Sequence, residues 1–252
     1  MLNLFKKKYT ARPIFAPLGT DMHCHLVPRV DDGSKCIEES VECLQTLWEV
    51  GYRKVIITPH FQYPRFPNDE DDIKLRFEEL KRQAKEQGVE IEIAGIGGEY
   101  RIDTGFAQRL ENPRFLMVGG KYVLVEFSLH QQMMGSDELI FDLQMKGYEV
   151  ILAHPERYPY LNVDGMRMEQ LKNQGVYFQI NALSLGGFYG EEAKHRAYEM
   201  LERGWVEFMG TDTHNTMYAQ ALRDLSCNRK VEKLIEKYQF MNNTLYTHAN
   251  IN

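Results

Sequence analysis

Histidine and acidic residues recur along this chain at spacings suited to binding metal ions. His23 and His25 stand two residues apart, and Asp212 and His214 repeat that spacing near the other end of the chain. In an extended segment, residues i and i+2 point to the same side, so each pair can present two ligands to one cation. Another candidate is one aspartate of the pair Asp31-Asp32, in the loop that follows His25. The remaining candidates stand singly at or just after the ends of short apolar runs: His60, Glu99, Glu126 and His154.

The types of these side chains indicate which ions would bind and what chemistry would follow. Imidazole together with carboxylate suits ions such as Zn²⁺, Mn²⁺ and Fe²⁺. One metal site needs three or four ligands, so about nine candidates favour two or three ions. Two cations about 3.5–4 Å apart can bind both the attacking and the leaving oxygen of a phosphoryl group. Without cations, several acidic side chains converging in a buried place would be costly.

Arg157 is the candidate for binding phosphate. It stands three residues after His154, in the motif Ala153-His154-Pro155-Glu156-Arg157. Its guanidinium fork matches phosphate oxygens bidentately. The alternative is a surface salt bridge with the neighbouring Glu156. Together with the metal ligands, Arg157 predicts a metal-dependent phosphoesterase.

Short apolar runs that alternate with amphipathic segments must position these residues. Two of the amphipathic segments, Cys36–Val50 and Asp69–Gln87, have helical periodicity, and the acidic start of the second suits a helix N-terminus. Glycines that fit helix C-caps precede strands at Gly51, Gly88, Gly147, Gly175 and Gly204. The Val- and Ile-rich runs predict strands at Gly19–His25, Lys54–Pro59, Glu90–Ile96, Tyr122–Glu126, Glu149–Ala153, Val176–Ile180 and Val206–Gly210.

Strands that alternate with helices predict an α/β fold with a parallel sheet. We expect one domain over residues 1–252 that closes into a barrel of about seven strands, with residues 1–18 as an N-terminal extension. An open doubly wound sheet is the alternative, although no glycine-rich nucleotide-binding motif follows any strand. In a barrel, the carboxyl ends of all strands share the face where such enzymes build their sites. The candidate ligands would meet there.

Composition excludes several other classes of protein. A formal net charge of −6 argues against a nucleic-acid backbone as the main partner. No run approaches the roughly 18 apolar residues of a membrane span, and the N-terminus lacks the apolar stretch of a secretory signal. The basic run Lys6-Lys7-Lys8 could touch anionic lipid or form a solvated terminus. Three other histidines, His130, His195 and His248, are expected at the surface.

The four cysteines argue for a cytoplasmic protein and against thiol chemistry. Cys24, Cys36, Cys43 and Cys227 form no CxxC pair and no disulfide framework, which indicates a reducing compartment. A cysteine-based phosphatase would need an arginine six residues after its cysteine, and none of the four has one. Cys24 lies between His23 and His25 but should point away from them, because side chains alternate along a strand.

The ordered set of motifs resembles a known family. Asp-x-His-x-His, Asp-Asp-Gly-Ser-Lys, Thr-Pro-His, Gly-Glu-Tyr, Val-Glu-Phe-Ser, Ala-His-Pro-Glu-Arg and Gly-Thr-Asp-x-His-Asn occur in the order seen in the PHP (polymerase and histidinol phosphatase) superfamily. More narrowly, residues 19 to about 225 resemble the bacterial CpsB/CapC protein-tyrosine phosphatases of capsule and exopolysaccharide operons. The resemblance implies a distorted, TIM-like (β/α)₇ barrel with a trinuclear metal centre. Its ions are often Mn²⁺ or Fe, with Zn²⁺, Co²⁺ or Mg²⁺ as alternatives.

The resemblance also implies a division of the ligands. It selects Asp32 over Asp31, a choice that spacing alone leaves open, and it makes Arg157 the phosphate-binding residue. The implied substrate is a phosphotyrosine protein, typically the tyrosine-rich tail of a membrane-bound tyrosine autokinase. By this resemblance, one ion would bind His23, His25, Glu99 and Asp212, a second would share Glu99 and add Glu126 and His154, and a third would bind Asp32, His60 and His214.

Two departures keep other functions open. Some members of the family carry an arginine a few residues beyond Asp-x-His-Asn, whereas this chain has none between Asn215 and Arg223. About twenty residues precede the first motif. The alternatives for this segment are that it docks a partner, that it stabilises an oligomer, or that it is a disordered extension. The alternative functions are a small-molecule phosphatase of the histidinol-phosphatase type, an exonuclease, and an inactive metal-binding regulatory module.

Overall fold

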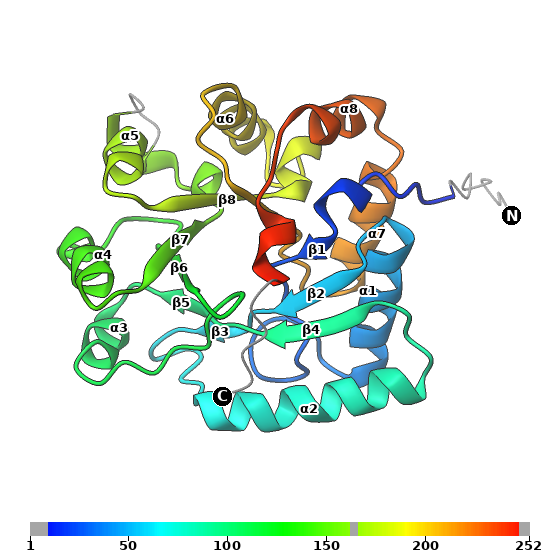
Figure 1. Ribbon diagram of the computed structural model, residues 1–252, viewed down its shortest axis with the longest axis horizontal. Helices are drawn as coiled ribbons and strands as arrows, with labels where there is room; N and C mark the ends of the chain where they lie inside the picture. Colours follow the sequence, from blue (N-terminus) through cyan, green and yellow to red (C-terminus); the bar gives the residue numbers. More distant parts are fainter. Residues whose placement is uncertain (1–9, 162–165, 247–252) are drawn as a thin grey trace, which may run out of the picture.

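The computed structural model describes residues 10–161 and 166–246 and shows a ring of parallel strands surrounded by helices (Figure 1). Its helices are α1 (Ile37–Glu49), α2 (Glu70–Glu86), α3 (Thr104–Arg109), α4 (Ser136–Met145), α5 (Met166–Asn173), α6 (Glu191–Glu202), α7 (Thr216–Leu225) and α8 (Arg229–Lys237). Its strands are β1 (Thr20–Asp21), β2 (Lys54–Ile57), β3 (His60–Phe61), β4 (Glu92–Ile96), β5 (Glu99–Arg101), β6 (Tyr122–Glu126), β7 (Glu149–Ala153), β8 (Tyr177–Asn181) and β9 (Phe208–Gly210).

Two parallel sheets join to close the barrel. One has the order β1-β2-β4 and the other the order β3-β5-β6-β7-β8-β9. The seam between β9 and β1 is bridged by the Asp212 N–H, which donates to the His23 carbonyl, and by the His25 N–H, which donates to the Thr213 carbonyl. The Thr58 N–H donates to the Cys24 carbonyl and links the first strand segment to the second. The fold is therefore the expected closed barrel and not an open sheet.

The described part of the chain has nine strands, because two short strands, β3 and β5, follow the expected strands at Lys54–Pro59 and Glu90–Ile96. Pro59 separates β2 from β3 because proline has no N–H to donate to the sheet. Gly97 and Gly98 separate β4 from β5, and a Cβ atom on Gly98 would lie within 3 Å of the Tyr100 and Phe61 rings. The first expected strand, Gly19–His25, is also shorter, because only Thr20–Asp21 forms regular pairs with β2.

The helices begin and end close to where the sequence predicts. α1 and α2 each lie one residue inside the expected bounds at both ends. Asp69 caps α2, since its side chain accepts hydrogen bonds from the Asp71 and Asp72 N–H groups. All five glycines expected at helix C-caps have positive φ angles, for example +119° at Gly51.

Part of the expected N-terminal extension packs on the barrel. Ile14, Phe15 and Leu18 are buried, and the Phe15 ring stacks on Tyr52 with centroids 5.3 Å apart. A disordered extension is therefore wrong for residues 10–18. The Lys6-Lys7-Lys8 run lies outside the described residues. No helix in the described ranges is both long enough and apolar enough to cross a membrane.

Candidate metal centre

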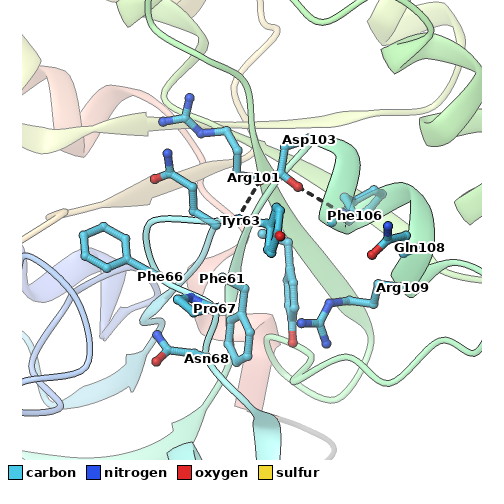
Figure 2. Close-up of a pocket in the computed structure, with 13 residues that line it drawn as sticks. Phe61, Tyr63, Phe66, Pro67, Asn68, Arg101, Asp103, Phe106, Gln108 and Arg109 are labelled. Carbon is cyan, nitrogen blue, oxygen red and sulfur yellow. Dashed lines mark hydrogen bonds between the residues drawn. The ribbon is translucent and has the colours of Figure 1, made fainter.

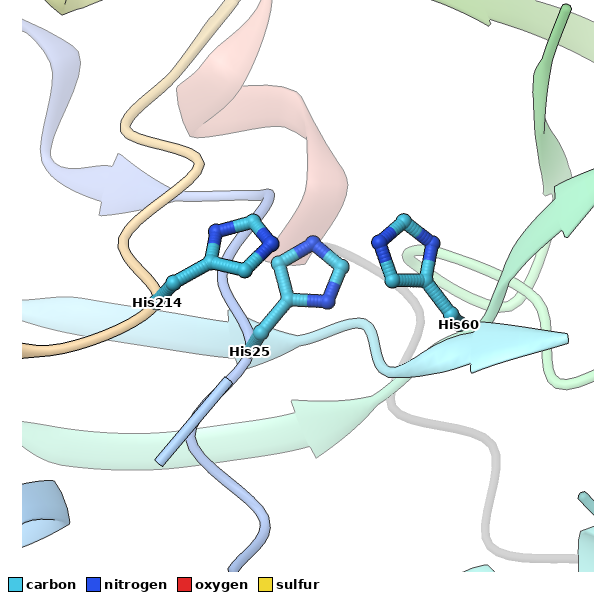
Figure 3. Close-up of side chains that lie close together, drawn as sticks. All are labelled: His25, His60 and His214. Carbon is cyan, nitrogen blue, oxygen red and sulfur yellow. The ribbon is translucent and has the colours of Figure 1, made fainter. Parts of the chain in front are cut away.

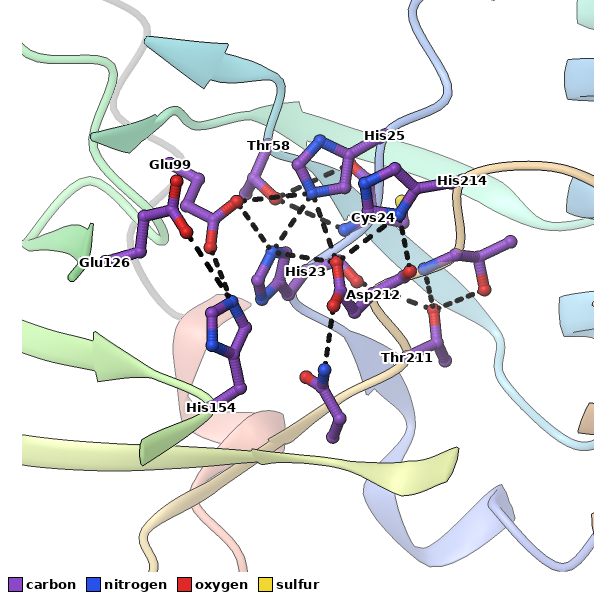
Figure 4. Close-up of polar contacts among 12 residues, drawn as sticks. His23, Cys24, His25, Thr58, Glu99, Glu126, His154, Thr211, Asp212 and His214 are labelled. Atoms are coloured by element: carbon purple, nitrogen blue, oxygen red, sulfur yellow. Dashed lines mark hydrogen bonds and ion pairs between the residues drawn. The ribbon is translucent and has the colours of Figure 1, made fainter. Parts of the chain in front are cut away.

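The nine side chains expected as metal ligands come together at the carboxyl ends of the strands. Figure 4 shows this cluster without Asp32 and His60. They arrive from six places around the barrel, as far apart in sequence as His23 and His214. The cluster contains four overlapping groups of three residues each. Within each group, the three ligand atoms lie within 4.8 Å of one another. These groups are His23–His25–Asp212, His23–Glu99–His154, His60–Glu99–Glu126 and His25–His60–His214.

Glu99, the first residue of β5, is the hub of the cluster. It is fully buried, and its Oε1 lies 3.0 Å from His154 Nε2. Its Oε2 lies 2.9 Å from His60 Nδ1, 3.3 Å from His23 Nε2 and 3.4 Å from His25 Nε2. One carboxylate thus faces four imidazoles, an arrangement suited to bridging two ions.

The directions of these atoms fit cations better than hydrogen bonds. His60 Nδ1 and Glu99 Oε2 are close and buried, yet neither has a partner with hydrogen-bond geometry among the described residues. His23 Nε2 and His25 Nε2 lie 3.2 Å apart. Two imidazole lone pairs at that distance repel each other unless a proton or a metal ion lies between them. The donor set therefore fits divalent ions with mixed nitrogen and oxygen coordination.

A second part of the cluster consists of His25, His60 and His214, whose rings approach one another closely in Figure 3. The His25 and His214 ring centroids are 4.1 Å apart. Asp32 lies at the edge of this group, with its Oδ1 3.5 Å from His60 Nε2 and 3.6 Å from His214 Nε2. The exposed Asp32 carboxylate can therefore complete a site with His60 and His214.

Asp31 has a different position from Asp32. Its buried carboxylate accepts a hydrogen bond from His25 Nδ1 at 2.9 Å and another from the His60 N–H at 2.9 Å. Holding Nδ1 as a donor leaves His25 Nε2 free to coordinate an ion. This role of Asp31 is not predictable from the sequence, because adjacent aspartates in a loop carry no spacing signal.

A hydrogen-bonded chain on β8 supports the opposite side of the cluster. His23 Nδ1 donates to Gln179 Oε1 at 2.8 Å, and Gln179 Nε2 donates to Asn181 Oδ1 at 2.9 Å. Asn181 Nδ2 in turn donates to Asp212 Oδ2 at 2.7 Å. Gln179 and Asn181 therefore orient two candidate ligands. Neither residue was among the predicted site residues, although their i, i+2 spacing on a strand without a ligand of its own is a signal for such a role.

Two candidate ligands have strained backbones. His154 has φ = +37° and Asp212 has φ = +54°, the left-handed region that residues other than glycine seldom adopt. His154 directly follows β7, and Asp212 lies two residues beyond the end of β9. At both places the chain must turn while the side chain points into the metal centre. Such strain persists only where surrounding structure enforces it, and it concentrates at functional sites.

Arg157 lies against the cluster and not against Glu156. Its Nη1 donates to Asp212 Oδ2 at 3.0 Å, and its guanidinium stacks 4.3 Å from the centre of the Tyr189 ring. Glu156 is fully buried and accepts hydrogen bonds from the Asn181 N–H and the Ser184 hydroxyl. The salt-bridge alternative for Arg157 and Glu156 is therefore wrong.

Neighbouring charges shift the pKa values of the histidines and acids in the cluster. Burial lowers the pKa of His23, but the Glu99 and Asp212 carboxylates outweigh it and raise that pKa to about 9. Burial would raise the pKa of Glu99, yet His23, His60 and His154 hold it well below its usual range. His214 differs, because burial and the neighbouring His25 lower its pKa to about 4. Protons on imidazoles thus balance the acids wherever ions do not.

Other expectations concern residues outside the cluster. Cys24 points away from the ligands, as expected, since its thiol is buried in the core near the Ile56 carbonyl. His130 and His195 are exposed, as expected, and His248 lies outside the described residues. Arg223 does not supply the guanidinium missing after Asn215, because it pairs with Glu49 on the outer surface at 2.7 Å.

This chain is similar in sequence to known bacterial proteins. Over 201 residues the chain is 32% identical to the tyrosine-protein phosphatase CpsB of Streptococcus pneumoniae, covering 77% of this chain and 82% of that protein. It is 29% identical over 196 residues to the tyrosine-protein phosphatase YwqE of Bacillus subtilis, covering 77% of each.

Solved structures share the architecture. One of them comes from work on YwqE of Bacillus subtilis and CpsB of Streptococcus pneumoniae, which are described as metal-dependent tyrosine phosphatases. It superposes on this chain with a TM-score of 0.72 at 26% identity. The match covers 88% of this chain and 96% of that one. A phosphotriesterase homology protein from Escherichia coli shares the fold alone, with a TM-score of 0.53 at 14% identity. The family model for capsular polysaccharide synthesis, CpsB/CapC, matches residues 19–250, and the chain therefore belongs to the CpsB/CapC family.

Proposed function

We propose that this protein is a metal-dependent protein-tyrosine phosphatase. The observation that carries the proposal is the convergence of nine nitrogen- and oxygen-bearing side chains around Glu99, with the Arg157 guanidinium beside Asp212. Its relatives in the family bear the name tyrosine-protein phosphatase, which favours phosphotyrosine over other phosphate esters. All nine expected ligand positions carry a side chain that can bind a metal ion, which argues against an inactive regulatory module.

We assign the ligands to three ions, with Mn²⁺ or Fe as the preferred metals and Zn²⁺, Co²⁺ or Mg²⁺ as alternatives. Mixed imidazole and carboxylate coordination suits these borderline and hard ions. The short contacts around Glu99 support its sharing between two of the sites. The first ion would bind His23, His25, Glu99 and Asp212, the second Glu99, Glu126 and His154, and the third Asp32, His60 and His214.

The protein's own residues would position the phosphoryl group and orient the metal ligands. Arg157 can hold two phosphoryl oxygens because its guanidinium is fixed from one side by Asp212 and from its face by Tyr189. Asp31 keeps the His25 imidazole, and Gln179 the His23 imidazole, in one tautomer and one orientation. Bound divalent ions would supply Lewis acidity and acidify a water molecule near neutral pH.

We further propose that the substrate is a phosphorylated tyrosine of a membrane-bound tyrosine autokinase that controls capsule or exopolysaccharide synthesis, and that the reaction takes place in the cytoplasm. The support is the match to a capsular polysaccharide family. An oligomeric assembly is compatible with this function. The partly exposed rim around Asp32 and His214 would admit a phosphotyrosine on a flexible protein segment.

The decisive experiment measures bound metal and substrate choice on one preparation. We expect transition-metal ions in the purified protein and faster hydrolysis of phosphotyrosine peptides than of histidinol phosphate or short oligonucleotides. His23→Ala and Asp212→Ala should abolish turnover of p-nitrophenyl phosphate while circular dichroism stays that of a folded protein. Full activity in either metal-reconstituted variant would refute the assignment, and a preference for histidinol phosphate or oligonucleotides would refute the substrate.

A further inference from the structure

Arg101, the last residue of β5, is a second guanidinium at the metal centre. Its Nε donates to Glu126 Oε1 at 3.0 Å, as the two residues are direct partners in the β5–β6 pair. Arg157, in contrast, approaches from the side of Asp212. The two guanidinium groups thus contact carboxylates that belong to different parts of the ligand cluster.

The contacts of Arg101 leave most of its hydrogen-bonding capacity unused. Only Nε forms a hydrogen bond, to Glu126 Oε1, and neither Nη1 nor Nη2 has a hydrogen-bond partner among the described residues. A guanidinium with both terminal nitrogens free presents the edge that binds two oxygens of a phosphate at once. A guanidinium in a protein keeps its positive charge throughout the working pH range.

The surroundings of Arg101 form a defined space and not open surface. Its side chain is only 17% exposed, and the residue borders a cavity of about 200 Å³ that Phe61, Tyr63, Phe66 and Asp103 also line. Figure 2 shows the Arg101 guanidinium turned away from the Phe61 and Tyr63 rings. Phe66 also stacks on the candidate ligand His60, with ring centroids 5.7 Å apart, so the cavity adjoins the metal centre.

Another guanidinium near the cluster is a weaker candidate. Arg65 lies 3.1 Å from Asp32, but its side chain is 60% exposed. Holding an exposed, flexible side chain in one position costs conformational entropy. Arg101 is fixed by a strand and by Glu126 and is therefore better prepared to bind an anion.

We propose that Arg101 is a second phosphate-binding residue of the active site, which holds phosphoryl oxygens from the Glu126 side while Arg157 holds them from the Asp212 side. The inference rests on the proposed phosphatase function. It also accounts for the lack of an arginine between Asn215 and Arg223, because β5 supplies a guanidinium from another strand. The competing role is structural, in which Arg101 only neutralises Glu126 and keeps that ligand in place.

The test compares Arg101→Met, Arg101→Lys, Arg157→Met and the control Arg114→Met, all loaded with Mn²⁺. Arg114 is an exposed arginine paired with Asp71 outside the centre. Calorimetry measures binding of inorganic phosphate, and mass spectrometry measures bound metal. Arg101→Met should weaken phosphate binding about tenfold to hundredfold, the range for lost charge-assisted hydrogen bonds, with metal content unchanged. Arg101→Lys should bind phosphate with intermediate affinity, and Arg114→Met should match the wild type.

Two outcomes would overturn the proposal. Unchanged phosphate affinity in Arg101→Met would remove Arg101 from the binding site, and loss of bound metal would show that it only positions Glu126. Either result leaves the phosphatase function standing if the wild type hydrolyses phosphotyrosine. A wild type that binds phosphate but hydrolyses no phosphotyrosine would instead refute the proposed function, while the phosphate titrations would still decide the role of Arg101.

Discussion

Asp31 Oδ2 accepts a hydrogen bond from His25 Nδ1 at 2.9 Å and lies inside the protein, whereas the adjacent Asp32 reaches the cluster from its exposed rim. The two aspartates therefore have separate tasks. Asp31 fixes the tautomer and the ring orientation of His25, and Asp32 is available as a ligand. A hydrogen-bonding carboxylate behind a metal-bound imidazole also raises the basicity of that imidazole.

Replacing Asp31 should consequently weaken metal binding without removing a ligand. We expect Asp31→Asn to lower metal affinity about 10- to 100-fold, the range for loss of a partner behind a metal-bound histidine. Competition with a chelator of known affinity measures the effect. Asp72→Asn, at an exposed aspartate paired with Arg76, is the matched control and should bind metal like the wild type. Wild-type affinity in Asp31→Asn would contradict the role given to the Asp31–His25 hydrogen bond.

The fold was predictable where local signals and burial agree. The runs at Tyr122–Glu126 and Glu149–Ala153 are strands with the expected bounds, because every neighbouring strand is parallel and nearly all of their residues are buried. The short strands β3 and β5 were missed, since the hydrophobic pattern alone does not show that strand pairing resumes after Pro59 and after the pair Gly97-Gly98. The interruptions before these strands depend on neighbours such as Tyr100 and Phe61, which only the folded chain brings together.

The part of the candidate site that was predictable from the sequence is the set of ligands at or near the ends of strands. Histidines and acids at strand ends meet because parallel strands end on one face. The residues behind them were not predictable in the same way. Gln179, Asn181 and Asp31 act through contacts with residues distant in sequence or through side-chain direction, and Arg101 resembles any arginine at a strand end. Their roles emerge from geometry and not from spacing.

The buried thiols should be inert and the reaction independent of cysteine. Burial raises the pKa of Cys43 to about 12 and that of Cys24 well above its usual value, so neither is a thiolate near pH 8. Cys36 and Cys227 are partly exposed. Iodoacetamide at pH 8 should therefore label Cys36 and Cys227 first and leave phosphatase activity largely intact, as peptide mass spectrometry and a parallel assay can show. Activity lost in step with labelling of any cysteine would contradict a metal-based reaction.

Metal affinity should rise with pH up to about pH 9. In the metal-free protein the pKa of His23 is raised to about 9, so an ion must displace a proton at pH 7. Each displaced proton makes the apparent affinity rise about tenfold per pH unit. Titrations at pH 7, 8 and 9 in a chelator buffer test this dependence. His23→Gln should show a shallower slope, and a flat profile in the wild type would contradict the protonated state.

The same shift gives the metal-free protein the opposite pH dependence of stability. A histidine whose pKa rises from 6.5 on folding stabilises the folded state fully below pH 6.5. That contribution is lost as pH rises through about 9. Thermal unfolding in the presence of a chelator should therefore show a melting temperature that falls from pH 6.5 to pH 9. A rise over that interval would show that other groups control the stability of the cluster.

Asn242 should be essential to the closed barrel although it lies far from the ligands in sequence. Its buried side chain accepts a hydrogen bond from the Met209 N–H and donates to the carbonyls of Met209 and Thr20, so it links β9 to β1. Asn242→Ala would leave these buried groups unpaired, and we expect a loss of roughly 3 kcal/mol in the free energy of unfolding.

For a chain of this length that loss corresponds to a melting temperature about 6–12 °C lower. The neighbouring Asn243 provides the control, because its exposed side chain makes a single hydrogen bond to the Pro17 carbonyl. Asn243→Ala should shift the melting temperature much less. Differential scanning calorimetry of both variants decides the matter, since equal shifts would mean that the seam between β9 and β1 does not depend on the Asn242 amide. Metal content should remain at the wild-type level in folded Asn242→Ala, because the substitution leaves every ligand in place.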